Sequence, residues 1–409
     1  MLRSMFSGVS GLRSHQTMMD VVGNNIANVN TAGFKSSSVV FADTLSQLTK
    51  AAGAPTDAAA GTNPAQVGLG VRVQAIATNM TQGSAQSTGK STDLMLQGDG
   101  MFAIQQGDGT FYSRNGSFTL DANGSVVTND GGYVMGWKAD EAGNVNTNSQ
   151  IGKLVIPSDT VMPAVATDEV TIKGNLDKTA NADGSARSVQ SSFTAYDDQG
   201  VASKIYLTFT NSGTDDKWSV GWSPTADGTP TALGTGIDFG ATSGATAAPT
   251  SLTITGGPTG DDITVDLSQL TGYVGTTGTS SLNPVADGAP IGTLTGFSFG
   301  TDGVITGNYS NGYKQTLGQI AIASFNNVAG LRKEGNSLYS VSTNSGQPVF
   351  GIAGSAGRGA ILAGSLEMSN VDLSAEFTNL ILAQRGFQAN SKVITSSDEL
   401  LQDLVNLKR

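Results

Sequence analysis

The sequence contains no cysteine and a single histidine, His15, among 409 residues. The lack of cysteine excludes disulfides, thiolate catalysis and cysteine-ligated zinc. A histidine-based catalytic triad could use only His15, which lies in an N-terminal segment with helical periodicity. We therefore expect His15 to be a surface or packing residue. We expect no enzymatic activity, no cofactor and no metal site.

Charge and long apolar runs are also scarce. Charged residues make up 13% of the chain, and the formal net charge is −11. Residues 151–308 hold 16 acidic and 6 basic residues, so the rest of the chain is nearly neutral. An acidic chain without a basic stripe is a poor partner for nucleic acid or anionic lipid. No run approaches the roughly 18 apolar residues that cross a bilayer, so we expect no membrane insertion.

The N-terminal residues do not have the pattern of an ordinary secretory signal. The stretch MLRSMFSGVSGLRSHQ lacks a continuous apolar region and a small-residue cleavage site. If the protein leaves the cytoplasm, we expect it to do so without a cleavable signal peptide.

Glycine is abundant, with 54 residues, and short apolar alternations recur between turn residues. This combination predicts β structure rich in turns. Turn signals at residues 107–109, 115–116, 123–124 and 130–132 predict a β-meander or a small barrel. A comparable β pattern returns at residues 311–325 and 337–351.

Both ends of the chain carry apolar residues at intervals of seven, which predicts two amphipathic helices. These two columns, which we call the apolar seam, consist of Met5, Leu12, Met19 and Ile26 at the start and of Leu373, Leu380, Phe387, Ile394 and Leu401 at the end. A neighbouring column in each helix is mixed, and contains Gln16, Gly23, Gln384, Ser391 and Asp398. We expect the helices to bury their apolar columns against each other as a coiled pair, and the mixed columns to meet neighbouring copies.

Shorter patterns complete the prediction for the ends. Asp372 and Glu376 suit the first turn of the C-terminal helix, with Ser369 or Asn370 as its cap and Lys408 and Arg409 closing it. Residues 39–48 have the pattern of a short helix, and residues 50–66 that of a small-residue linker.

Together these patterns predict a mainly β fold with terminal α-helices. The N- and C-terminal helices pair in a coiled-coil-like domain, followed by nested, discontinuous β domains. The expected parts are a helical assembly domain at 1–35 and 366–409, a connecting segment at 36–70, an inner β domain at 71–150 and 309–365, and an outer acidic β domain at 151–308.

Three patterns could carry chemistry, and each has a simpler interpretation. Paired carboxylates at 197–198, 215–216 and 261–262 could suggest a glycosidase, but aspartate close to glycine favours turns. The stretch DANGS at 121–125 is typical of a hairpin rather than a calcium loop. Trp218, Val220 and Trp222 would share one face of a strand, either as a sugar-stacking platform or, as we favour, as core packing.

Three stretches carry a family resemblance. The stretch GNNIANVNTAGFK resembles the N-terminal signature of flagellar rod and hook proteins, and the last 41 residues resemble their C-terminal signature. FYSRNGSFTLDANG is similar to their shared central β domain. The signature residues are Asn24, Asn25, Ala27, Asn28, Thr31, Gly33, Phe34 and Lys35 at the start and Gln384, Arg385, Gly386 and Phe387 at the end.

The resemblance implies a structural subunit of the flagellar hook, a hollow helical homopolymer that joins rod to filament as a universal joint. It implies export through the flagellar type III apparatus, an extracellular location, and contacts with the distal rod protein, the hook cap and the hook–filament junction proteins. The large segment 151–308 favours a hook protein over the shorter rod proteins. Two alternatives are a distal rod protein and a secreted carbohydrate-binding or adhesive β protein that uses Trp218 and Trp222.

Overall fold

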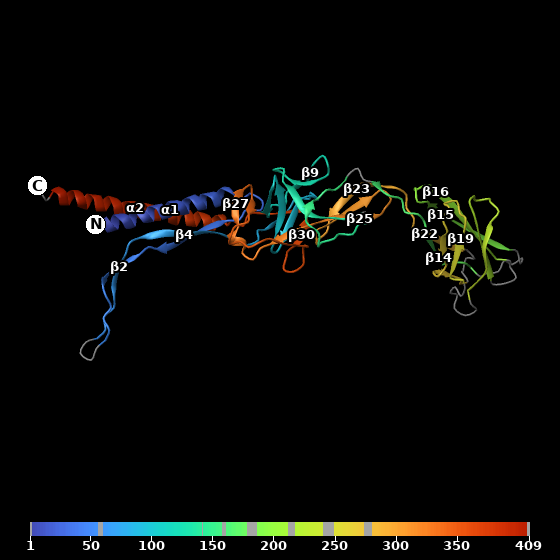
Figure 1. Ribbon diagram of the computed structural model, residues 1–409, viewed down its shortest axis with the longest axis horizontal. Helices are drawn as coiled ribbons and strands as arrows, with labels where there is room; N and C mark the ends of the chain where they lie inside the picture. Colours follow the sequence, from blue (N-terminus) through green and yellow to red (C-terminus); the bar gives the residue numbers. More distant parts are fainter. Residues whose placement is uncertain are drawn as a thin grey trace. The chain divides into compact units, whose positions relative to one another are not determined.

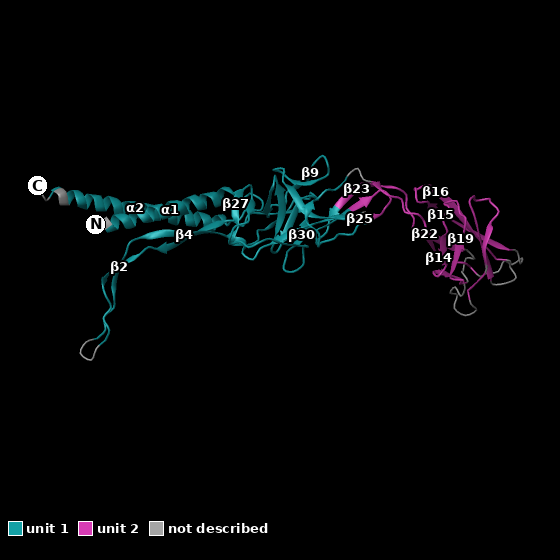
Figure 2. Ribbon diagram, viewed as in Figure 1, with its two compact units in different colours: residues 1–157, 298–306, 316–409 teal, residues 158–297, 307–315 magenta. Residues whose placement is uncertain are grey.

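The computed structural model describes residues 2–55, 60–140, 142–157, 161–177, 186–211, 217–239, 249–273 and 280–406. The chain forms two compact units, coloured separately in Figure 2. Unit 1 comprises Met1–Pro157, Ser298–Thr306 and Thr316–Arg409, and unit 2 comprises Ser158–Phe297 and Gly307–Gln315. Among the residues described, no helix has both the length and the apolar character needed to cross a membrane.

Unit 1 contains both helices and many short strands (Figure 1). The helices are α1 (Leu2–Ala27) and α2 (Leu373–Asn406). The strands between residues 36 and 157 are β1 (Ser37–Asp43), β2 (Ser46–Lys50), β3 (Ala65–Gly68), β4 (Val71–Thr78), β5 (Ala85–Ser87), β6 (Leu94–Gln97), β7 (Met101–Gln106), β8 (Gly109–Ser113), β9 (Phe118–Leu120), β10 (Val126–Thr128), β11 (Tyr133–Lys138) and β12 (Gly152–Lys153). The later elements are β26 (Ile322–Ser324), the 3-10 turn η1 (Val328–Gly330), β27 (Arg332–Gly335), β28 (Leu338–Ser340), β29 (Val349–Gly351), β30 (Ala360–Ala363) and β31 (Ser365–Glu367).

Segments from the two halves of the sequence pair within unit 1. β5 pairs antiparallel with β31, β6 with β30, and β7 with β26. A path of hydrogen-bonded strands runs in the order β11-β7-β8-β28-β27. The predicted fold class is confirmed: the chain is mainly β, its terminal helices are paired, and its β regions are nested.

The predicted turns of the meander are also confirmed, because all four lie between consecutive strands from β7 to β11. In the turn after β9, the carboxylate of Asp121 accepts hydrogen bonds from the N–H groups of Asn123 and Ser125, at 3.0 and 2.6 Å. The stretch DANGS is therefore a hairpin turn, as expected. Within the meander, the rings of Phe102 and Phe118 pack edge to face, with their centroids 5.2 Å apart.

The helix predicted at residues 39–48 is wrong. Residues 39–43 belong to β1 and residues 46–48 to β2, and β1 pairs antiparallel with β4 over its whole length. Val39, Val40 and Phe41 are β-branched or aromatic residues that suit a pleated, half-buried surface. The linker pattern also includes paired backbone, since β2 pairs with β3 and Gly53 bridges to Thr62.

Unit 2 is built from β strands that form separate sheets. Its strands are β13 (Val161–Met162), β14 (Glu169–Asn175), β15 (Arg187–Tyr196), β16 (Ala202–Asn211), β17 (Lys217–Ser223), β18 (Thr231–Asp238), β19 (Ser251–Ile254), β20 (Ile263–Asp266), β21 (Leu270–Thr271) and β22 (Ser281–Ala286). Three further strands have residues in both units: β23 (Gly292–Phe299), β24 (Val304–Tyr309) and β25 (Lys314–Ile320). One sheet has the order β15-β16-β17-β18, and another contains β19-β20-β14-β21 with β22 beside β14.

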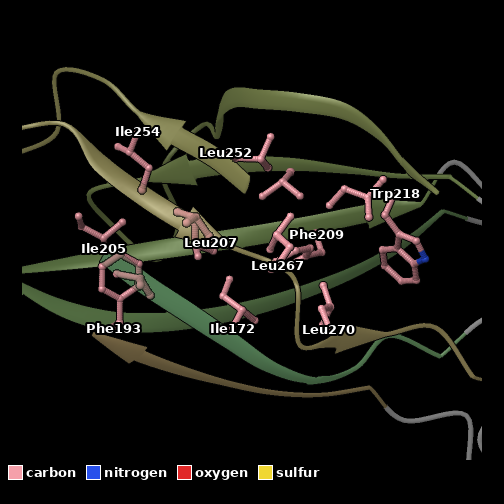
Figure 3. Packing of buried hydrophobic residues seen from close by; sticks show 14 of the residues in the cluster. Ile172, Phe193, Ile205, Leu207, Phe209, Trp218, Leu252, Ile254, Leu267 and Leu270 are labelled. Carbon is pink, nitrogen blue, oxygen red and sulfur yellow. The ribbon is translucent and has the colours of Figure 1, made fainter. Parts of the chain in front are cut away.

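One apolar core joins these two sheets. Figure 3 shows side chains from both sheets converging between the strands. Phe209 and Trp218 come from the first sheet, and Ile172 and Leu252 come from the second. Trp218 and Val220 are buried in this core and Trp222 packs against it. The core-packing interpretation of these three residues is therefore confirmed.

The unit boundaries differ somewhat from the predicted domain boundaries. Unit 2 begins after Pro157 and ends near residue 297, with a second short segment at 307–315, whereas the sequence placed the acidic domain at 151–308. The finer division of unit 1 into a helical domain, a connecting segment and an inner β domain stays a prediction. Lys408 and Arg409, Asp215 and Asp216, and part of the glycine-rich stretch after residue 231 lie outside the described residues.

Candidate functional site: the terminal helix pair and its buried anchor

The two terminal helices lie side by side and run antiparallel, so that the start of α1 and the end of α2 lie at the same end of the pair (Figure 1). The contacts fix this direction. The hydroxyl groups of Ser4 and Ser397 are 3.5 Å apart, and the side-chain amide of Asn25 donates a hydrogen bond of 2.9 Å to Glu376. Early residues of α1 therefore meet late residues of α2.

The apolar seam is only partly buried in this pair, and its role as a packing surface stays a prediction. Its residue Ile394 lies in the interface, because a Cβ atom added to Gly8 would be 3.2 Å from the Ile394 side chain. Met5, Leu12, Met19 and Ile26 are half-buried, as are Leu380, Ile394 and Leu401. Leu373 and Phe387 are 39% and 36% exposed. In the mixed column Gln16, Gly23, Gln384 and Asp398 are exposed and Ser391 is half-buried. The expected contact of this column with neighbouring copies stays a prediction.

Small and polar residues bring the two helices close together. Gly8 and Gly11 of α1 face Ile394 and Asn390 of α2, and Gly386 of α2 faces His15. Ala383 and Ser397 of α2 are buried. They allow close approach of the helix backbones, as small residues do wherever helices pack tightly. The apolar seam remains partly open, most of all at Leu373 and Phe387.

Two glycines show how close the approach is. A Cβ atom added to Gly11 would lie 2.7 Å from the side chain of Asn390, and one added to Gly386 would lie 2.5 Å from the ring of His15. Real Cβ atoms do not approach other atoms so closely, so these positions accept only glycine without a shift of their neighbours. His15 also lies near Phe41, with ring centroids 6.0 Å apart, and is a packing residue.

The N-terminal signature forms the turn that follows α1. The side chain of Asn25, fully buried, pairs with the backbone of Ser37 by donating to its carbonyl at 2.8 Å and accepting from its N–H at 3.0 Å. Asn28 donates to the carbonyl of Asn24, and the hydroxyl of Thr31 donates to the amide oxygen of Asn28. These bonds hold the turn in place and tie the end of α1 to the backbone at Ser37.

Gly33 sits where no other residue fits. Its φ is +70°, a left-handed conformation that glycine adopts without strain. A Cβ atom there would lie 2.6 Å from the backbone nitrogen of Asn115. The N–H of Gly33 donates a hydrogen bond of 2.7 Å to the carbonyl of Glu367, so the turn is joined to the strand that precedes α2.

The signature ends on a buried cluster of charges, which we call the anchor: Lys35, Arg114 and Glu367. Their exposed fractions are 0%, 5% and 1%. The Lys35 ammonium forms an ion pair with one carboxylate oxygen of Glu367 and donates to the carbonyl of Thr81 at 2.8 Å. The Arg114 guanidinium lies 3.5 Å from the other oxygen. The anchor therefore joins the end of α1, the β meander and the start of α2.

Burial sets the electrostatics of the anchor. It lowers the pKa of the Lys35 ammonium below its ordinary value, although the hydrogen bond and charge of Glu367 act to raise it. Burial likewise lowers the pKa of Arg114, against the opposing charge of Glu367. Nearby, burial raises the pKa of Tyr339 to about 12. The carboxylate of Glu367 also accepts a hydrogen bond from the N–H of Gly83 at 2.9 Å, which satisfies it further.

Two more contacts fasten the helices to the β region. Asn370 accepts a hydrogen bond from the N–H of Ser36 at 2.8 Å and donates to the carbonyl of Asn79 at 2.9 Å.

Asn370 is not the cap of α2. The cap is Asp372, whose carboxylate accepts from the N–H groups of Ser374 and Ala375, at 2.9 and 3.2 Å. The Lys333 ammonium lies 5.2 Å from the ring centre of Phe34.

The C-terminal signature residues fall on two faces of α2. Gly386 faces α1, whereas Gln384 and Arg385 are exposed and Phe387 is 36% exposed.

The aspartate pairs that could have suggested a glycosidase lie in turns or loops where the structure describes them. The carboxylate of Asp197 accepts from the N–H groups of Gln199 and Val201 at 3.0 and 2.7 Å. Asp261 and Asp262 are exposed between β19 and β20, while the pair at 215–216 lies outside the described residues.

Sequence reasoning missed the other two residues of the anchor. Glu367 and Arg114 lie 332 and 79 residues after Lys35, so no local pattern connects them with the signature. It also missed the close contacts of Gly8 and Gly11 with α2. A signal was available, because Gly8, His15 and Val22 recur at intervals of seven, but the neighbouring apolar column was stronger.

Three family models match segments of the chain. They are described as "Flagella basal body rod protein" over residues 5–35, "Flagellar hook protein FlgE/F/G D1 domain" over residues 95–175 and "Flagellar basal body rod FlgEFG protein C-terminal" over residues 362–407. Over 454 aligned residues the chain is 40% identical to the flagellar hook protein FlgE of Borreliella burgdorferi, with 100% of both chains covered. The chain belongs to the flagellar hook protein family.

Other relatives agree along the whole length. The chain is 34% identical to the flagellar hook protein FlgE of Salmonella typhimurium, covering 99% of this chain and 100% of the relative. It is also 33% identical to the flagellar basal-body rod protein FlgG of Bacillus subtilis, with 100% of each chain covered. Within this hook protein, the matched terminal segments contain α1, the signature turn, Glu367 and α2.

Proposed function

We propose that this chain is the structural subunit of the bacterial flagellar hook and self-assembles into a hollow, curved helical tube. The tube acts as a universal joint that transmits motor torque to the filament. The observation that carries the proposal is full-length similarity to hook proteins, at 40% identity to the one from Borreliella burgdorferi. A distal rod protein is the second candidate, favoured by the 33% identity to the FlgG protein of Bacillus subtilis.

The helix pair supports assembly because it leaves large apolar side chains uncovered. Phe6 is 70% exposed, Phe377 50%, Leu382 60% and Leu400 57%. Exposed apolar side chains of this size mark surfaces that meet other proteins. In the tube these surfaces meet neighbouring copies of the chain, and the partly open apolar seam contributes to the same contacts.

The hook location places further proteins at the two ends of the tube. We expect the distal rod protein at one end, and the hook cap and later the hook–filament junction proteins at the other. Delivery through the flagellar type III apparatus, without a cleavable signal peptide, belongs to the same proposal.

Electron microscopy of the purified full-length chain under polymerising conditions tests the function. We expect curved tubes, whereas straight tubes would favour the rod protein and an absence of tubes would contradict both. Leu380→Asp and Phe387→Asp place a charge in the apolar seam and should abolish the tubes while the β units stay folded by circular dichroism. Val201→Asp, at a position in unit 2 that is 58% exposed, is the matched control and should still polymerise.

A further inference from the structure

A groove lies on the side of α1 that faces β4. It has a volume of about 460 Å³ and is lined by Phe6, Val9, Arg13, Val71 and Arg72, among others. Phe6 and Val9 present apolar surface that is 70% and 37% exposed. Arg13 and Arg72 are exposed on either wall, one from the helix and one from the strand. The groove therefore combines exposed apolar side chains with two exposed positive charges.

The late turns of α2 carry the opposite charges. Glu399 and Asp403 are one helical turn apart and both are exposed. They flank Leu400, which is 57% exposed, and Val393, two turns earlier, is 43% exposed. This stretch presents an apolar ridge with acidic side chains beside it, the form in which amphipathic helices enter grooves.

Within the part of the chain that the structure describes, the charges on these two surfaces form no ion pair. Among the described residues, the ion pairs are formed by Lys35, Lys90, Arg114 and Arg332 with their acidic partners. Arg13, Arg72, Glu399 and Asp403 take part in none of them. Each surface therefore has charges and apolar side chains available for a partner.

We infer that the groove of one copy receives the Val393–Asp403 stretch of α2 from a neighbouring copy. Leu400 and Val393 pack on Phe6 and Val9, and Glu399 and Asp403 pair with Arg13 and Arg72. The inference rests on the proposed homopolymer, and charge complementarity selects this stretch over the other exposed ridge of α2, at Phe377 and Ile381. That ridge is 50% and 58% exposed at these two residues and has no pair of exposed acidic side chains beside it.

Charge reversal tests the pairing. Arg13→Glu with Arg72→Glu makes the groove acidic, and we expect it to raise the critical concentration for polymerisation at low salt at least ten-fold. Adding Glu399→Lys and Asp403→Lys to the same chain restores opposite charges and should bring the value back to within about three-fold of the unchanged protein. The control is Lys204→Glu with Lys217→Glu, which makes the same change in net charge at exposed sites in unit 2 and should have little effect.

Disulfide trapping identifies the occupant directly, because the chain has no cysteine of its own. Single variants Val9→Cys and Leu400→Cys are mixed, polymerised and oxidised, so that only two different copies can form the mixed dimer. We expect this dimer with Leu400→Cys and not with Phe377→Cys. A dimer with Phe377→Cys alone, or reversal variants that polymerise normally, would overturn the inference. Failure of the unchanged protein to polymerise would instead contradict the proposed function.

Discussion

Lys35, Arg114 and Glu367 come from three distant segments and meet in the anchor, where water does not reach them. A buried ion pair adds little to stability compared with a well-packed apolar group, but removal of one partner leaves a buried charge uncompensated. Lys35 and Arg114 both pair with the carboxylate of Glu367, so the loss of Glu367 would leave both positive charges without a partner.

Glu367→Ala should lower the free energy of unfolding of unit 1 by about 3–5 kcal/mol, because it leaves Lys35 and Arg114 buried without a counter-charge. Urea unfolding measures this loss of stability. Trp137 is the tryptophan of unit 1, so both proteins carry Trp218→Phe and Trp222→Phe and the fluorescence of Trp137 reports the unfolding of unit 1 alone.

The control for this variant is Glu334→Ala, which removes an ion pair to Arg332 at the surface, where the Arg332 side chain is 72% exposed. Exposed pairs contribute little, so the unfolding curve should hardly move. Equal effects of the two variants would show that the anchor does not hold unit 1 together.

Tyr339 should give unit 1 an alkaline pH dependence. Its pKa is about 12 in the folded protein and 10.0 in its ordinary state, so the folded state keeps a proton that the unfolded state has lost. Its contribution is complete below pH 10 and is lost as pH rises through 12, a loss of up to about 2.7 kcal/mol for two pKa units.

Tyr339→Phe should remove this part of the alkaline loss, and urea unfolding from about pH 9 upward compares the two slopes. Tyr273→Phe, at an exposed position in unit 2, is the control. Parallel slopes for the unchanged protein and Tyr339→Phe would show that Tyr339 does not titrate late.

At the scale of elements, the pairing of α1 with α2 depends on small residues rather than on apolar bulk. An exposed glycine within a helix lowers its stability by about 1 kcal/mol relative to alanine. Gly8 and Gly11 are kept in α1 because the partner helix occupies the space where their side chains would be. The resulting pair is close-packed along one line and open along its flanks.

Two glycine variants separate these effects. Gly23→Ala has free space around the new methyl group and should stabilise α1 by about 1 kcal/mol. Gly11→Ala places the same methyl group 2.7 Å from Asn390 and should instead destabilise the helix pair. Thermal unfolding followed at the helix band of the circular dichroism spectrum measures both, and stabilisation by both would contradict the close approach.

At the scale of the whole molecule, each unit has its own core. In unit 2, Phe209 is fully buried in the core that Trp218 also occupies. Phe209→Ala should destabilise unit 2 by about 3–5 kcal/mol through the cavity that it leaves. Fluorescence of Trp218 and Trp222 should report the earlier unfolding, while the transition of Trp137 in unit 1 stays in place.

The same variant tests where assembly lies. Because the helix pair belongs to unit 1, Phe209→Ala should still form tubes at temperatures where unit 2 is folded only in part. Loss of tubes together with unit 2 would show that the core of unit 2 is needed for the lattice.

Local patterns in the sequence were sufficient for the features that depend on local chemistry. The helices at Leu2–Ala27 and Leu373–Asn406, and the turns of the meander, follow from periodicity and from Asn–Gly and Asp–Gly pairs, whose backbone preferences act over a few residues. The sequence predicts a helix at 39–48, where the structure has strands. Local patterns miss β1 because this strand forms by pairing with β4, about 30 residues later in the chain.

The tertiary structure alone decided which face of each helix is covered and which charges are buried. An apolar column in the sequence indicates that a helix has one face that avoids water. Which face is buried depends on how closely the partner helix can approach, and glycine and alanine permit the closest approach. In the sequence, Lys35 has the pattern of an ordinary surface lysine. In the fold it is buried beside Glu367 and Arg114, away from water. The energy of a charge depends on the groups around it in space and not on its neighbours in the chain.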